Sequence, residues 1–129
     1  MPHIDYVQSV SLPKLLDVLT LSVSPVLSEV DRAKQMSFPD SDSVVLYFAK
    51  TIEDLRHKAQ KVLNHPMLSR YELQKSWEFN VLDSLTALLE EVNDYYGDGS
   101  ESLYEFLGIM HNRLRRAQAY ISEFYGNIT

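Results

Sequence analysis

The sequence feature that most constrains the fold is an apolar residue recurring every three or four positions over long segments of the chain. Over residues 43–64, 70–96 and 101–125 this spacing is sustained for many turns, and in the first of these segments the remaining positions are largely charged. A helix advances by about 3.6 residues per turn, so such spacing gathers the apolar side chains on one face. The sequence therefore predicts three long amphipathic helices.

The N-terminal part of the chain, residues 11–36, carries a similar apolar stripe that is interrupted by a proline. Ser11 followed by Pro13 is typical of a helix start, where a missing N–H costs nothing. Pro25 lies inside the stripe, and an internal proline bends or ends a helix. We therefore expect a bent N-terminal helix or a helix pair.

No segment has the alternating pattern of a strand, so the predicted class is all-α, an antiparallel up-and-down helical bundle. Residues 1–10 are expected to form a short lead-in, 11–126 a single domain, and 127–129 a frayed tail beyond Gly126. The length of 129 residues is enough to bury one core. Glycine and serine residues mark the expected helix ends. Gly97-Asp98-Gly99 is a predicted helix stop, and Ser69–Glu72 and Ser102–Glu105 are predicted capping boxes at helix starts.

The composition limits the cellular location and the classes of partner that we expect for the protein. The chain has no cysteine, which excludes disulfides and thiolate metal sites and favours a reducing, cytoplasmic location. No run approaches the roughly 20 apolar residues that a membrane-spanning helix needs, so a membrane is not an expected partner. The net charge of −6 argues against nucleic acid, because a phosphate backbone would be repelled.

Few residues suggest metal or cofactor chemistry. Asp54 and His57 lie one helix turn apart, but they fall on the polar face, and no second pair of this kind exists to complete a metal site. The chain has no glycine-rich phosphate loop and no nucleophile motif of the Gly-x-Ser-x-Gly type. We therefore expect no metal, no cofactor and no enzymatic activity.

His111 supports an alternative, a histidine phosphotransfer protein. It lies in the middle of the last predicted helix, with arginines in the following turn. An exposed imidazole could attack a phosphoryl group, and nearby cations could hold its oxygens. Phosphotransfer bundles, however, place small residues where this chain has Arg115 and Arg116.

The same helix holds the densest cationic cluster of this acidic protein, formed by Arg113, Arg115 and Arg116. The cluster is either a solvated helix face or a contact for an anion or an acidic peptide. Binding of nucleic acid through these arginines is a second alternative. It would require further cations aligned on other helices.

Aromatic residues are more numerous than the predicted apolar seams can bury, with 8 Tyr, 5 Phe and 1 Trp. Tyrosine and tryptophan are enriched at interface hot spots, although such rings also pack at helix boundaries. Those that fall outside the main seams are Tyr47, Phe79, Tyr104 and Tyr120.

The leading hypothesis is a non-catalytic protein–protein interaction module of the adaptor, chaperone or inhibitor type, which binds a helix or peptide of another protein. A homodimer stays open, since exposed apolar surface could be covered by a second copy. The residues expected at the partner-binding site are Tyr104, His111, Arg113, Arg115, Arg116 and Tyr120.

Overall fold

The computed structural model describes residues 11–36, 41–68, 70–98 and 102–128, and these residues form four long helical rods. The predicted lead-in at 1–10 lies outside the described residues, as do Ser69 and 99–101. Within the described part of the chain there is no strand, as the apolar spacing predicted. The helices are α2 (Leu12–Gln35), α3 (Ser41–Leu63), α4 (Tyr71–Trp77), the π-helical turn η1 (Glu78–Leu82), α5 (Asp83–Asp98) and α6 (Leu103–Ile128).

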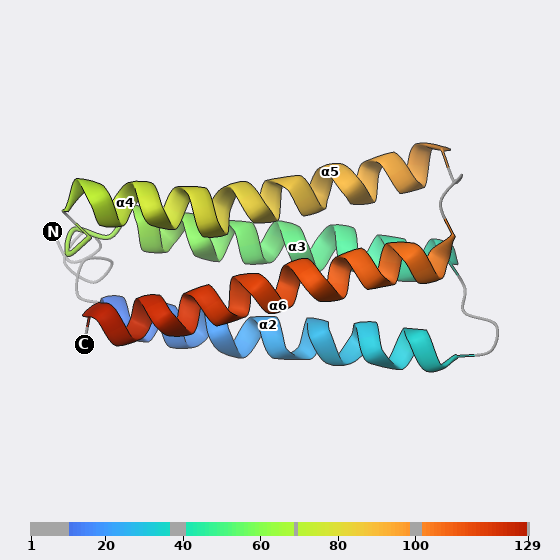
Figure 1. The fold of residues 1–129 in the computed structure, drawn as a ribbon, viewed down its shortest axis with the longest axis horizontal. Helices are drawn as coiled ribbons and strands as arrows, with labels where there is room; N and C mark the ends of the chain where they lie inside the picture. The colour runs from blue at the N-terminus through green and yellow to red at the C-terminus, as the bar shows by residue number, and fades with distance from the viewer. Residues whose placement is uncertain (1–10, 37–40, 69, 99–101, 129) are drawn as a thin grey trace, which may run out of the picture.

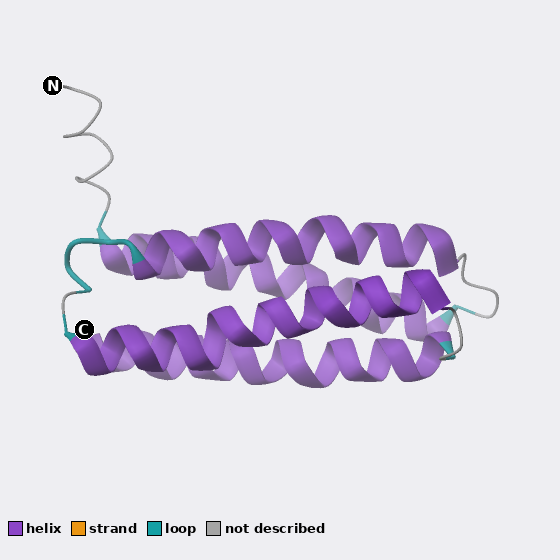
Figure 2. Ribbon diagram, turned by 90° about the horizontal axis from the view of Figure 1, so that it is seen from above, coloured by secondary structure: helices purple, strands orange, loops and turns teal. Residues whose placement is uncertain are grey.

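The rods lie lengthwise beside one another, and consecutive rods run in alternating directions (Figures 1 and 2). The helices α4, η1 and α5 follow each other without a break and make up the third rod. The helix α2 packs against α3 and α6, and α5 packs against the same two neighbours. Consequently α2 and α5 stand at opposite corners of the bundle, which is the predicted all-α arrangement.

The helix α2 is continuous through Pro25, so of the two expected alternatives the structure shows a single helix and not a helix pair. Ser11 caps the helix as predicted, because its hydroxyl accepts a hydrogen bond from the Lys14 N–H at 3.2 Å. Pro25 lies on the exposed face, where its ring meets solvent rather than a neighbouring helix. The carbonyl that loses its donor there belongs to Leu21, which is also exposed, so water can satisfy it.

The third rod is predicted as one regular helix, but it contains a π-turn. Its hydrogen bond runs from the Asp83 N–H to the Glu78 carbonyl, five residues back. The predicted Ser69 cap lies outside the described residues, and the observed N-cap is Arg70, which makes no side-chain capping bond. This rod lies at one corner of the bundle and leaves Phe79 73% exposed.

The last helix begins where the sequence predicts and ends later than predicted. Ser102 caps α6 as predicted, since its hydroxyl accepts from the Glu105 N–H at 3.1 Å. The helix does not end at Gly126, however, but continues to Ile128, which is half-buried against the core. Gly126 therefore does not end the helix, and residues 127 and 128 belong to its last turn.

All four rods contribute buried side chains to one apolar core. Trp77 is fully buried in it and donates a hydrogen bond from its indole Nε1 to the Ala59 carbonyl at 2.9 Å. At the other end of the bundle, Phe48 and Phe106 are also fully buried. None of the described helices combines the length and apolar character needed to cross a membrane.

Candidate functional site

The six residues predicted for partner binding all belong to α6, but the structure places them on two sides of it. A residue advances by about 100° around a helix, so Arg113 and Arg116 share one side and Arg115 points away from both. Arg113 and Arg116 line a hollow between α6 and the third rod. The side that includes His111 faces α2. The predicted arginine cluster is thus divided, and the structure does not bring the six residues into one compact site.

His111 is half-buried between α6 and α2, whereas the phosphotransfer hypothesis needs an exposed imidazole. Its Nε2 lies 3.6 Å from Oδ1 of Asp31. Nearby on the same interface, Gln118 donates to the Ser24 hydroxyl at 3.4 Å. A carboxylate facing the imidazole nitrogen would repel an incoming phosphoryl group. This geometry does not favour the phosphotransfer hypothesis.

The two predicted tyrosines differ in their surroundings. Tyr120 is half-buried, and its hydroxyl hydrogen-bonds to Ser76 on the third rod. Its ring lies beside Trp77 and Phe124, with centroids 6.5 and 6.2 Å away, so it packs against the core. Tyr104 is 54% exposed, and its hydroxyl donates to the Met36 carbonyl at 3.3 Å, which joins α6 to the end of α2.

Arg113 and Arg116 lie beside an exposed aromatic ring that the sequence had not assigned to the site. Both arginines are exposed, and neither pairs with a carboxylate of any described residue. A hollow of about 320 Å³ brings them together with Phe79 and Ala87, and a second of about 440 Å³ adds Ile109. We call Phe79, Ala87, Ile109, Arg113 and Arg116 the Phe79–arginine surface.

The π-turn accounts for the position of Phe79. From Leu73 the buried seam of the third rod continues through Trp77, Val81 and Leu85, always at a spacing of four residues. In a regular α-helix three such steps would rotate the seam by about 120°, because each step overshoots one turn by 40°. The wider π-turn takes up this rotation, so the seam stays on the core and Phe79 stays outside it.

Polar side chains near the π-turn are occupied by hydrogen bonds. Asn80 donates to the Ser76 carbonyl at 2.9 Å, and Ser84 donates to the Asn80 carbonyl at 3.0 Å. Ser84 is therefore not held by a base as a nucleophile would be. Asp83 is the one carboxylate among the described residues that line the smaller hollow. The surface offers an aromatic ring and two cations for contact.

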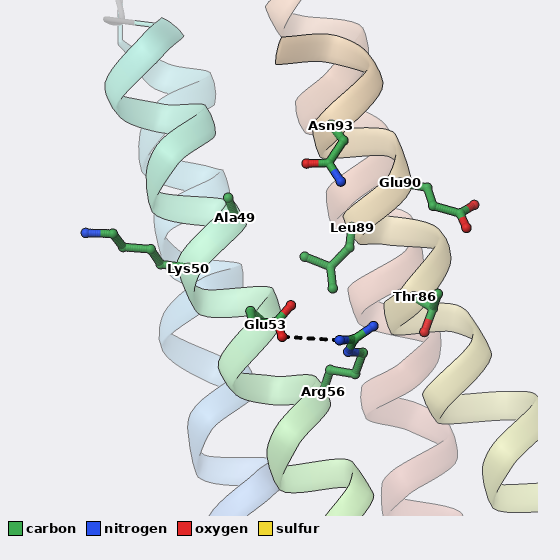
Figure 3. A pocket seen from close by; sticks show the side chains of 8 residues that line it. All are labelled: Ala49, Lys50, Glu53, Arg56, Thr86, Leu89, Glu90 and Asn93. Atoms are coloured by element: carbon green, nitrogen blue, oxygen red, sulfur yellow. Dashed lines mark hydrogen bonds and ion pairs between the residues drawn. The ribbon is translucent and has the colours of Figure 1, made fainter. Parts of the chain in front are cut away.

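A larger hollow lies elsewhere, between α3 and α5, with a volume of about 720 Å³. In Figure 3, Leu89 points toward α3 and lines this hollow, whereas Lys50 and Glu90 point outward. Arg56, the cation inside it, already pairs with Glu53 at 3.2 Å. Because this arginine is neutralised within its own helix, the hollow offers a ligand less unpaired charge than the Phe79–arginine surface does.

His57, the histidine considered for a metal site, is exposed and lies 3.3 Å from Glu53 rather than against Asp54. Asp54 instead pairs with Lys58 at 2.7 Å, and the same Lys58 ammonium reaches the Ser22 hydroxyl of α2 at 2.9 Å. Among the described residues, no three His, Asp or Glu side chains come together as metal ligands would. These side chains contact each other and their neighbours on the surface instead.

The sequence had marked Phe79 as lying outside the main seams, but not as a neighbour of the arginines, since nothing in one helix shows what stands beside it. The one sequence signal for the exposed position of Phe79 was the repeated four-residue spacing of apolar residues before Leu85.

No family model matches this chain, and neither the curated proteins nor the solved structures contain a significant match to it.

Proposed function

We propose that the protein is a non-catalytic protein–protein interaction module that receives a helix or peptide of its partner on the Phe79–arginine surface. The observation that carries the proposal is the exposure of Phe79, 73% of whose surface is open to solvent, beside two arginines without ion-pair partners among the described residues. Interface cores are enriched in aromatic residues and arginine, and such residues dominate binding energy.

The architecture supports the same proposal. The surface lies between two rods of a bundle whose own core is complete without Phe79. A groove between two helices is a common acceptor for the apolar face of a partner helix. Replacement of Phe79 should therefore change binding and leave folding nearly intact, because substitutions of exposed residues usually alter stability by less than about 0.5 kcal/mol.

The test compares Phe79→Ser with Leu21→Ser in capture experiments from cells that make the protein. Leu21 is the matched control, since it is 72% exposed but lies on α2, at the opposite corner of the bundle from α5. We expect wild type and Leu21→Ser to retain the same partner, identified by mass spectrometry, and Phe79→Ser to lose it. A partner retained equally by Phe79→Ser, or lost equally by Leu21→Ser, would refute the proposed surface.

A further inference from the structure

We infer that the occupant of the Phe79–arginine surface is an acidic amphipathic helix of another protein, which places carboxylates against Arg113 and Arg116. This inference rests on the proposed function and adds the chemistry of the partner. It depends on two properties of the surface, its unpaired charge and its dimensions.

The charge of the surface is opposite to that of the protein as a whole. The protein carries a net charge of −6, yet two cations stand together here, with Asp83 as the carboxylate lining the same hollow. Two other arginines of the described structure do form ion pairs. Arg32 and Arg56 each pair with a glutamate three residues earlier on the same helix. Arg113 and Arg116 form no ion pair with any described residue, Asp83 included, so both guanidinium groups can receive a carboxylate supplied from outside.

The dimensions of the surface suit a helix. Arg113 and Arg116 are three residues apart on α6, and side chains at this spacing start about 5–6 Å from each other. Carboxylates three or four residues apart on a partner helix have the same spacing, so two pairs can form at once. Phe79 and Ala87 mark about 12 Å of the third rod at 1.5 Å per residue, which equals roughly two turns of a partner helix. Apolar residues of that helix would cover the Phe79 ring.

Arg115 provides a control with the same change in charge. It is exposed and adjacent in sequence to Arg116, but it lies on the side of α6 away from the third rod and does not line either hollow of the surface. Replacement of Arg115 or Arg116 by glutamate therefore alters the net charge equally. Only the second change puts a negative charge on the Phe79–arginine surface.

The test uses two fluorescein-labelled, helix-forming peptides of about 20 residues. They share one leucine stripe and differ in the flanking positions, which are glutamate in one peptide and lysine in the other. Binding to the full chain is measured by fluorescence anisotropy. At about 50 mM NaCl we expect the glutamate peptide to bind at least about tenfold more tightly, and at about 500 mM this advantage should shrink through screening.

The variants fix the location of the effect. Arg116→Glu should abolish the preference for the glutamate peptide, whereas Arg115→Glu, which changes the net charge equally, should keep it. Arg113→Glu/Arg116→Glu should reverse the preference in favour of the lysine peptide, and Phe79→Ser should weaken the binding of both peptides. The helical circular dichroism of each variant checks its fold.

Three results would overturn the inference: equal or absent binding of both peptides, a preference that survives the double charge reversal, or an equal loss with Arg115→Glu. If Phe79→Ser nevertheless loses the cellular partner, the proposed function stands and only the acidic nature of that partner is wrong.

Discussion

At the scale of single residues, Tyr47 shows how the bundle perturbs a tyrosine at its surface. Its ring is half-buried on α3 and packs edge-on against Phe48, with ring centroids 5.3 Å apart. Burial raises the pKa of the Tyr47 phenol, and the negative charge of Glu29 on α2 raises it further, whereas Arg32 lowers it. Arg32 in turn hydrogen-bonds to Glu29 and lowers the pKa of that carboxyl. The net effect on Tyr47 is a phenol that resists ionisation in the folded protein.

This perturbation predicts a loss of stability in alkaline solution. The unfolded chain has the ordinary tyrosine pKa of 10.0, so the folded protein holds its proton to higher pH than the unfolded chain does. The contribution is fully present below the unfolded pKa and is lost as pH rises through the folded pKa. Tyr47→Phe removes the ionisable group. In urea unfolding from about pH 8 to 11, the stability of this variant relative to wild type should be constant up to about pH 9 and then rise. A constant difference over the whole range would contradict the prediction.

At the scale of helices, the π-turn is the element that sequence periodicity could have revealed but did not. The buried seam from Leu73 to Val92 has spacings of 4, 4, 4, 3 and 4 residues, with Trp77, Val81, Leu85 and Leu88 between. Removal of one residue between Trp77 and Val81 changes this series to 4, 3, 4, 3 and 4, which is the spacing of a regular α-helix in a bundle. The π-turn thus amounts to one extra residue in an otherwise regular rod.

Deletion of Phe79 should therefore preserve the fold, because it restores regular spacing and removes an exposed side chain. We expect a wild-type helical signal at 222 nm and cooperative urea unfolding. The control is deletion of Ala87, which lies between Leu85 and Leu88 in a regular part of α5 and would rotate Val92 away from the core. The free energy of unfolding of that variant should fall by several kcal/mol, as it does when a large core side chain is truncated, or the variant should fail to unfold cooperatively. Equal damage from the two deletions would show that the π-turn is not one added residue.

The helices themselves were predictable because each is long and amphipathic, so that the period outweighs local exceptions such as Pro25. The ends were less predictable: Gly126 reads as a terminator, yet contact between Ile128 and the core holds the last turn in place. The site was predictable only in part, since Arg113 and Arg116 stand out by charge. Their separation from Arg115 follows from helix geometry, but their contact with Phe79 depends on how two rods pack.

At the scale of the whole molecule, two groups of aromatic rings lie at opposite ends of one apolar core. Where α4 lies beside the end of α6, Trp77 packs against Phe124 with ring centroids 4.8 Å apart. At the far end, Phe106 packs against Tyr95 at 4.8 Å and Phe48 at 6.2 Å. Buried side chains of all four rods connect these groups into a single cluster. A bundle with such a continuous core should unfold in a single cooperative transition.

Phe106→Ala tests this cooperativity, because it damages one end while the single tryptophan reports on the other. Truncation of a fully buried phenylalanine should cost about 3–5 kcal/mol. If the bundle unfolds as one unit, the urea midpoint seen by Trp77 fluorescence will fall as far as the midpoint seen by circular dichroism at 222 nm, since both probes follow the same transition.

Tyr104→Ala is the matched control in the same turn of α6. Because the Tyr104 ring is exposed, its removal should lower the free energy of unfolding only slightly. A fluorescence midpoint left near its wild-type value while the dichroism midpoint falls would mean that the two ends of the bundle unfold separately. The third rod and the end of α6 would then form the more stable unit around Trp77.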